Sequence, residues 1–228
     1  RIPVLVGISD TALTESLHLA EEAAKAGASG LVVAPPYYLR YSQSDLLYYL
    51  EQLSADLPLP LLLYNFPDLT KIPFSPATVQ RASEMPGIIG LKDSSGDMEY
   101  LNEVLRVVPR NFGIFVGPER HLLEALRAGA RGGVCGGSNV NPQLFAALYN
   151  AAANGDWATA EQLQAQVDRM ADLLYGIGDP ETGYLRGIKC AASFLDLCEG
   201  VLAAPLRAFT ENESSNIETA LRVLKLIK

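Results

Sequence analysis

Short runs of continuous apolar residues recur every 20 to 30 residues along the first two thirds of the chain, and a helical pattern follows each run. A strand that is apolar along its whole length is buried on both faces, which is typical of parallel sheets. We therefore predict a parallel sheet built from successive βα units. The six predicted strands are residues 3–8, 30–34, 60–64, 87–92, 112–117 and 132–136.

The segments between these runs carry apolar residues at helical spacing. In the first of them Asp10 and Thr11 are candidate N-caps, and Ser42 is the candidate N-cap of the second. The predicted helices of the βα units are residues 10–26, 42–54, 75–84, 97–108, 118–129 and 141–153.

After about residue 155 the strand signal stops, and three further helices are predicted at residues 156–176, 182–198 and 214–227. The expected α/β fold thus has six βα units in residues 1–154 and a C-terminal three-helix region in residues 155–228. Six strands fit an open doubly wound sheet. They also fit a TIM (β/α)8-type barrel of which six units are present. Periodicity alone does not separate these two architectures.

The composition disfavours several classes of protein. A formal net charge of −8 argues against nucleic-acid and membrane-surface partners, which need a basic face. No stretch reaches the roughly 20 apolar residues of a membrane helix. Three cysteines without a C-x-x-C pattern and two histidines disfavour a disulfide framework and a histidine-ligated metal site. We therefore expect a cytoplasmic protein that holds no metal.

Lys92 ends the apolar run at 87–92, where a buried lysine is unexpected. The active sites of α/β barrels lie at the carboxyl ends of the strands. A desolvated lysine has a larger fraction of free amine, which can attack a ketone and form a Schiff base. The structural alternative is a buried lysine that pairs with Asp93, Glu119 or another carboxylate.

Tyrosines end the two preceding strands. Tyr64 begins a Tyr-Asn-Phe-Pro segment, and its phenol would lie one strand from Lys92 and could move a proton to a carbinolamine. The alternative is a tyrosine that caps the core through a backbone hydrogen bond. Tyr37 and Tyr38 follow two prolines, where exposed aromatic residues often mark an interface, the alternative being ordinary packing over the barrel rim.

A glycine-rich segment covers residues 132–139 and offers close backbone approach to a ligand. Barrels often bind phosphate in this region, so a phosphate-binding isomerase is a rival hypothesis. No Walker pattern and no G-x-G-x-x-G after a strand is present, so nucleotide binding has little support. Cys135 lies in this segment and is expected to be a small buried apolar residue.

Together these segments resemble the dihydrodipicolinate synthase/N-acetylneuraminate lyase family of pyruvate-type class I aldolases, which have a (β/α)8 barrel. The residues that carry the resemblance are Gly90-Leu91-Lys92-Asp93-Ser94-Ser95-Gly96-Asp97, Tyr64-Asn65-Phe66-Pro67, Pro36-Tyr37-Tyr38 with Arg40, Ser42 and Gln43, and Gly133-Val134-Cys135-Gly136-Gly137-Ser138-Asn139-Val140. Each segment alone is a weak indicator of the family, but four segments in this order and at this spacing are a specific one.

The resemblance implies a role for each matching residue. Lys92 is expected to form the imine, Tyr64 to move protons above it, and Tyr38 to enter the active site of a partner subunit. The residues expected to bind the pyruvyl group are Gly117, Val134 and Asn65. The partners implied are pyruvate or another 2-oxo acid, an aldehyde, and copies of the chain in a homotetramer built as a dimer of dimers. Because the imine is the electron sink, no metal or organic cofactor is expected.

Two departures from the family pattern have consequences. The early Gly-Thr-Thr-Gly-Glu loop, which holds the pyruvate carboxylate, has no counterpart, and residue 4 corresponds to the family's third strand. We therefore expect a chain that lacks the first two βα units, leaves two strand edges unpaired and associates. The alternative function is a catalytically inactive barrel fragment or scaffold.

The second departure concerns the substrate. Dihydrodipicolinate synthases have an arginine after the Tyr-Asn-x-Pro segment that grips a carboxylate, whereas this chain has Asp68, Leu69 and Thr70. An aspartate repels a carboxylate where an arginine would bind it. A 2-keto-3-deoxy sugar acid, an acylneuraminate or 4-hydroxy-2-oxoglutarate therefore fits as well as, or better than, the aldehyde of the synthases.

Overall fold

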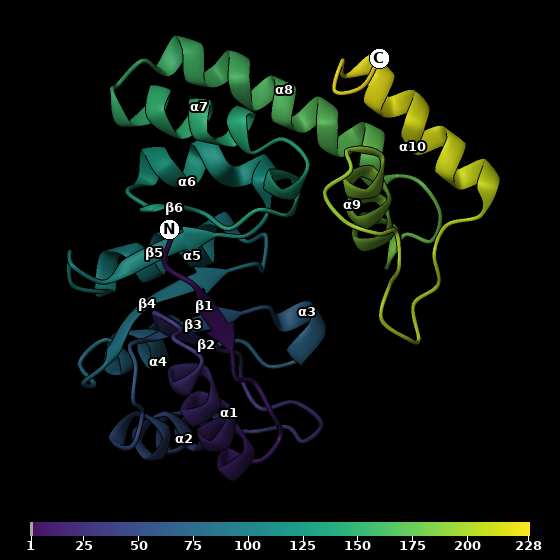
Figure 1. The fold of residues 1–228 in the computed structure, drawn as a ribbon. Coiled ribbons are helices and arrows are strands. Elements are labelled where there is room, and N and C mark those ends of the chain that lie inside the picture. Colours follow the sequence, from purple (N-terminus) through teal and green to yellow (C-terminus); the bar gives the residue numbers. More distant parts are fainter. Residues whose placement is uncertain (1) are drawn as a thin grey trace. The chain divides into compact units, whose positions relative to one another are not determined.

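The computed structural model describes residues 2–228. The chain forms two compact units, of which the first ends at Gly133 and the second begins at Val134 (Figure 1). The first unit contains the sheet and its helices, and the second contains helices joined by loops. The domain boundary predicted between residues 154 and 155 stays a prediction.

The sheet decides between the two architectures that the sequence left open. Within residues 2–228 it has six parallel strands in the order β1-β2-β3-β4-β5-β6. Each strand pairs with the next one along the chain, whereas a doubly wound sheet reverses its direction of growth at a switch point. The sequential order is that of a (β/α) barrel. The strands are β1 (Leu5–Gly7), β2 (Gly30–Val33), β3 (Leu61–Asn65), β4 (Ile88–Asp93), β5 (Gly113–Val116) and β6 (Gly132–Gly133).

The helices of the first unit follow the predicted βα alternation. Ser42 caps α2 in a full capping box with Asp45, as expected from the sequence. The first helix begins at Leu13, later than predicted, because Asp10 accepts a hydrogen bond from the Ala12 N–H at 3.0 Å in the turn before the helix. The helices are α1 (Leu13–Lys25), α2 (Gln43–Ala55), α3 (Pro67–Thr70), α4 (Pro76–Ala82), α5 (Met98–Val107) and α6 (Leu122–Ala128), with a 3-10 turn η1 (Glu119–His121).

The two faces of the sheet differ, contrary to the prediction that both would be buried. The face under the helices is fully buried, and its residues include Leu31, Val33, Leu61, Leu63, Leu91, Ile114 and Val116. On the opposite face Val32, Tyr64, Lys92 and Phe115 are half-buried. Alternation along a strand accounts for this pattern, because successive side chains point to opposite faces. The half-buried face thus carries Tyr64 and Lys92, two of the candidate site residues.

The predicted strand at 132–136 is much shorter in the structure. Only Gly132 and Gly133 pair with β5, and Gly136–Asn139 form a 3-10 turn, η2. Glycines weaken a strand because they have no side chain to pack and lose more conformational entropy. The strand predicted at residues 132–136 was therefore too long.

The second unit is a set of packed helices. Helix α7 packs against α8, α8 against α9, and α10 against both α8 and α9 (Figure 1). The last helix begins at Glu211, three residues before the predicted start, because Thr210 and Glu213 form a capping box. The bounds are α7 (Pro142–Ala153), α8 (Trp157–Tyr175), α9 (Gly183–Phe194) and α10 (Glu211–Val223).

None of the helices described between residues 2 and 228 is both long and apolar enough to cross a bilayer. Over the same residues, no group of His, Cys, Asp and Glu side chains is arranged to hold a metal ion.

Candidate active site

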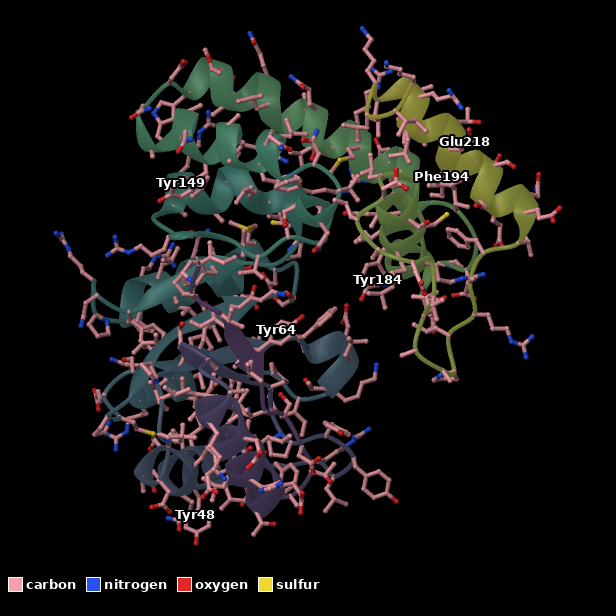
Figure 2. All side chains as sticks on the ribbon, in the orientation of Figure 1. Tyr48, Tyr64, Tyr149, Tyr184, Phe194 and Glu218 are labelled. Carbon is pink, nitrogen blue, oxygen red and sulfur yellow. The ribbon has the colours of Figure 1, made fainter. Side chains whose placement is uncertain are left out.

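Tyr64 and Lys92 lie directly opposite each other in neighbouring strands. The register of β3 and β4 pairs their Cα atoms, and the Lys92 Nζ lies 4.3 Å from the centroid of the Tyr64 ring. Figure 2 shows Tyr64 beside the strands of the first unit. Both residues sit at the carboxyl ends of their strands, which is where barrel enzymes carry out their chemistry. The structure thus brings together the two residues that the sequence singled out.

The surroundings of Lys92 exclude the structural alternative. Within residues 2–228 Lys92 takes part in no ion pair, and the Asp93 carboxylate is bonded elsewhere. Lys92 contacts the Tyr64 ring as a cation over a π face. On its other side it is paired in register with Phe115 of β5, which is half-buried on the same face. The amine is therefore not consumed by a carboxylate.

Asn65 and Asp93 follow the two candidate catalytic residues and point to the buried side of the sheet. The Asn65 Nδ2 donates to Asp93 Oδ1 at 2.7 Å, and Asn65 Oδ1 accepts from the Phe74 N–H at 3.0 Å. The Ser95 hydroxyl donates to Asp93 Oδ2 at 2.8 Å. Asn65 and Asp93 are 0% and 2% exposed. Both ends of the Asn65 amide are thus occupied by protein groups, and the predicted contact of this residue with substrate stays a prediction.

Burial has an electrostatic consequence for Asp93. Desolvation raises the pKa of its carboxyl, while hydrogen bonds from Asn65 and Ser95 oppose that rise. The nearby Tyr100 hydroxyl is buried, and within residues 2–228 it has no hydrogen-bond partner. Burial, with the Asp93 charge as a second cause, raises the pKa of Tyr100. The helix-facing side of the site is therefore buried.

The other predicted site residues are distributed more widely. Gly117 follows β5, and its N–H donates to the Asp93 carbonyl at 2.6 Å, so that N–H is not available to a ligand. Val134 is exposed and opens the second unit. Tyr38 lies in the loop after β2, is 92% exposed, and has a φ of +86°, which is unusual for a residue other than glycine. Within this chain, Tyr38 is not packed into the site.

Two polar side chains of the glycine-rich segment form hydrogen bonds within the segment itself. The Ser138 hydroxyl donates to the Cys135 carbonyl at 2.6 Å, and the Asn139 amide donates to the Gly136 carbonyl at 2.9 Å. Cys135 is buried, as the sequence predicted. These side-chain donors serve the local turn, which weakens the case for a phosphate-binding isomerase.

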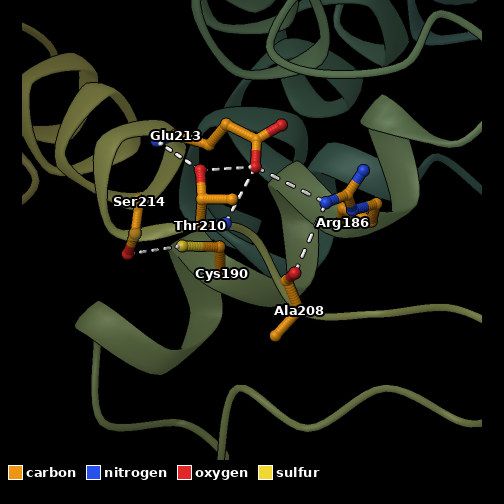
Figure 3. Close-up of polar contacts among 6 residues, drawn as sticks. All are labelled: Arg186, Cys190, Ala208, Thr210, Glu213 and Ser214. Atoms are coloured by element: carbon orange, nitrogen blue, oxygen red, sulfur yellow. Dashed lines mark hydrogen bonds and ion pairs between the residues drawn. The ribbon is translucent and has the colours of Figure 1, made fainter.

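The second unit has a polar cluster of its own, at the junction of α9 and α10 (Figure 3). The Arg186 Nη2 lies 3.5 Å from Glu213 Oε2 and donates to the Ala208 carbonyl at 3.4 Å. The Arg186 guanidinium stacks 4.5 Å above the Phe209 ring. Glu213 in turn accepts from the Thr210 N–H and hydroxyl, each at 2.8 Å. This cluster fixes the start of α10. The Thr-x-x-Glu pattern of Thr210 and Glu213 is visible in the sequence, but the contacts of Arg186 are not.

Sequence reasoning missed Phe115, Ser95 and the Asn65–Asp93 hydrogen bond. Phe115 could have been found, because alternation places it on the same face as Lys92 once β4 and β5 are known to be neighbours. The Asn65–Asp93 bond could not, since it depends on the register between segments 28 residues apart.

The sequentially ordered parallel sheet is that of a (β/α) barrel, and at its strand ends a lysine without an ion pair among residues 2–228 lies beside a tyrosine, the pair expected of a class I aldolase. Comparison with known proteins identifies the family. Residues 1–224 match the model of the Dihydrodipicolinate synthetase family, and the chain belongs to that family.

The relatives include synthases and aldolases. The structure described as dihydrodipicolinate synthase from Bacteroides thetaiotaomicron is 45% identical, has a TM-score of 0.93, and aligns over 98% of this chain and 76% of that one. The putative 2-dehydro-3-deoxy-D-gluconate aldolase YagE of Escherichia coli K12 is 32% identical over 99% of this chain and 75% of its own length. The 4-hydroxy-tetrahydrodipicolinate synthase of Archaeoglobus fulgidus is 27% identical over 100% of this chain and 77% of its own length.

Proposed function

We propose that this chain is a lyase or aldolase that forms a Schiff base between Lys92 and pyruvate or another 2-oxo acid. The observation that carries the proposal is the pairing of Tyr64 with Lys92, whose amine makes no ion pair within residues 2–228 and lies 4.3 Å from the centroid of the phenol ring. A relative supports the choice of ligand, since the YagE structure, 31% identical with a TM-score of 0.89, is described in complex with pyruvate.

In the proposed reaction the Lys92 amine attacks C2 of the 2-oxo acid and forms a carbinolamine. Tyr64 delivers a proton to the departing hydroxyl, water leaves, and an iminium remains. Loss of a proton from C3 gives an enamine, which attacks the carbonyl carbon of an aldehyde and forms the new C–C bond. The resulting alkoxide takes up a proton, and hydrolysis of the imine releases the product and restores the amine. Cleavage is the same sequence in reverse.

For the aldehyde partner we propose a hydroxylated aldehyde, so that the substrate cleaved is a 2-keto-3-deoxy sugar acid. Asp68 lies in the first turn of α3, immediately after the Tyr64 segment, where the resemblance implies an arginine in the synthases. A carboxylate at that place disfavours a second substrate carboxylate. The name of the aldolase relative YagE supports this choice. Synthase activity is the second candidate, because the 45% identical neighbour is described as a dihydrodipicolinate synthase.

We propose that the active form is a homo-oligomer in which the loop after β2 meets a second copy. Tyr37, Tyr38 and Leu39 are exposed side by side in this loop, and Tyr38 extends almost entirely into solvent. Exposed aromatic residues of this kind are enriched at interfaces. The homotetramer implied by the resemblance and the cytoplasmic location both stay predictions.

The test is borohydride reduction in the presence of pyruvate, followed by peptide mass spectrometry. The expected result is a pyruvate-dependent mass gain on the peptide that contains Lys92, and none on the peptide that contains Lys189. In a separate assay, protein that has not been treated with borohydride receives pyruvate with either glyceraldehyde or aspartate semialdehyde as the acceptor, and the rates of product formation are compared. No adduct on a folded chain would overturn the proposal and favour the inactive scaffold, and an adduct on another lysine would overturn the role of Lys92.

A further inference from the structure

The register between β3 and β4 changes just before the candidate catalytic pair. Leu61 is opposite Ile88, but Leu62 is opposite Gly90, so that Ile89 is an extra residue in β4. Such bulges recur next to active sites, where they re-aim side chains. From Leu62 onward the new register holds to the ends of both strands, and it sets Tyr64 opposite Lys92.

This shift decides which residue meets Tyr64. If the pairing of Leu61 with Ile88 continued unchanged, Tyr64 would be opposite Leu91 instead of Lys92. Leu91 is fully buried, and its side chain belongs to the helix-facing side of the sheet. Because side chains alternate, a slip of one residue exchanges the two faces of a strand. The position of the Lys92 amine opposite Tyr64 therefore depends on the shifted register. The pairing of Leu61 with Ile88 at the start of the strands does not produce it.

Gly90 makes room for the shift. A Cβ atom at this position would lie 2.3 Å from the Gly113 carbonyl oxygen and 2.7 Å from a Leu62 methyl group. The backbones of β4 and β5 approach closely at the point where β4 takes up its extra residue, and a side chain there would push them apart.

The Asn65–Asp93 bond holds the shifted register at the other end. These residues are paired directly across the two strands, one position beyond Tyr64 and Lys92. Their side chains form a buried 2.7 Å hydrogen bond, and the Phe74 N–H and the Ser95 hydroxyl hold the remaining oxygens. The Asn65–Asp93 bond can form only in the shifted register. A slip of one residue would carry one of the two side chains to the opposite face of the sheet.

We infer that Asn65 and Asp93 are positioning residues, a register clamp that keeps Lys92 opposite Tyr64 by acting through the strands. This inference rests on the proposed function and assigns a role in that same reaction to two side chains that do not reach the open face. Misplacement of a reacting group by about 1 Å can cost roughly 10²-fold in rate. A bond that holds the strand register therefore also maintains the rate of the reaction.

The test exchanges the two members of the clamp. Asn65→Asp places two carboxylates in contact at neutral pH, and we expect the rate of pyruvate trapping at Lys92 to fall by about 10²-fold. The double variant Asn65→Asp with Asp93→Asn restores one amide donor, one carboxylate acceptor and the original net charge. We expect it to return trapping to within about 3-fold of the parent chain, because the same bond re-forms with its direction reversed.

The control separates positioning from general loss of stability. Tyr49→Phe removes another partly buried side-chain hydrogen bond, from Tyr49 to Ser16 at 3.1 Å, away from both strands. We expect a comparable decrease in the free energy of unfolding from this variant and unchanged trapping. If Asn65→Asp does not fold, Asn65→Ser takes its place, since it shortens the side chain and breaks the same bond.

The outcomes are distinguishable. Slow trapping in the single variant together with rescue in the double variant supports the register clamp. Normal trapping in the single variant, or failure of rescue in a folded double variant, overturns the clamp and leaves the proposed function intact. Absence of an adduct in the unsubstituted chain removes both proposals at once.

Discussion

In the sheet unit, Asn65 and Asp93 bond at 2.7 Å below a face on which Tyr64 and Lys92 remain half-buried. In the helical unit, Arg186 and Glu213 pair at 3.5 Å beside Phe209, and the contacts described for them are with groups of the α9–α10 region (Figure 3). Both are polar clusters, but Asn65 and Asp93 are buried, whereas the side chains of Arg186 and Glu213 are partly exposed. In a strand, the residue next to Asn65 or Asp93 faces the opposite side of the sheet. In a helix, residues three or four positions apart lie on the same face. A buried bond in a strand can therefore set the geometry of an exposed site.

The two clusters also differ in how completely their polar groups are satisfied. The side-chain oxygens of Asn65 and Asp93 accept hydrogen bonds of ordinary length. Among the described residues Arg186 Nε has no partner, and the contacts of its Nη2 are long. Incompletely bonded buried groups contribute less to stability and geometry than satisfied ones. We therefore expect changes in the sheet cluster to slow the proposed chemistry, and changes in the helical cluster to cause only a modest loss of stability and no change in the chemistry.

The largest effect is expected for Lys92→Ala. Without the amine no imine can form, so pyruvate trapping and turnover should fall by about three orders of magnitude or more. The fold should persist, because the side chain is half-buried and makes no ion pair within residues 2–228. Lys189→Ala in α9 is the matched control and should trap normally. Comparable trapping by both variants would contradict the assignment of the imine to the lysine of the sheet unit.

Tyr64→Phe should be next in size. The ring stays, so the contact of Lys92 Nζ with its face is kept, but the hydroxyl that moves the proton is lost. We expect kcat to fall by about 10² to 10⁴-fold, the usual range for loss of a general acid–base group. Steady-state kinetics would measure it against Tyr48→Phe, an exposed tyrosine on α2. A variant with unchanged kcat would mean that another group carries the proton.

A pair of glycine variants tests whether crowding in the two units has different consequences. A Cβ at Gly90 would lie 2.3 Å from the Gly113 carbonyl oxygen, and one at Gly187 would lie 2.2 Å from the Leu174 carbonyl oxygen, where α9 packs on α8. Each substitution by Ala should decrease the free energy of unfolding by about 1–3 kcal/mol. Only Gly90→Ala should also slow trapping, and an equal slowing by Gly187→Ala would contradict the comparison.

Arg186→Met should lower stability without changing the chemistry. It removes the ion pair with Glu213 and the stacking on Phe209 while keeping most of the buried stem. We expect a loss of about 1–2 kcal/mol in the free energy of unfolding, measured by urea denaturation. The rate of pyruvate trapping per folded molecule should be unchanged, and a decrease of tenfold or more would show that the helical cluster supports the site.

The smallest effect is the pH dependence carried by Asp93. Burial raises the pKa of this carboxyl above its unfolded value, so the folded state binds the proton more tightly. The stability that this proton provides is present below the unfolded pKa and is lost as the pH rises through the folded pKa. Asp93→Asn removes this dependence. The stability of the variant relative to the parent should increase with pH above about 4, by at most about 1.4 kcal/mol per pH unit, and a flat difference in urea titrations would contradict it.

Much of the fold follows from local patterns. The continuous apolar runs correctly predicted six parallel strands, and the helical spacing predicted the helices between them to within a few residues. Lys92 and Tyr64 were found in the same way, since each is a polar residue at the end of an apolar run. The short helix α3 and the turn η2 were missed, because segments of four residues carry too little periodicity to register.

Strand order and register were decided by the tertiary structure. Residues 60–64 and 87–92 each read as strands, but nothing local says that they are neighbours, that Ile89 is an extra residue between them, or that Asn65 bonds Asp93 across 28 positions. Backbone propensity and side-chain periodicity act within a few residues, so the sequence by itself determined which segments are strands and which residues are candidates for the chemistry. Pairing is a contact between distant segments, so the Tyr64–Lys92 register came from the packed sheet.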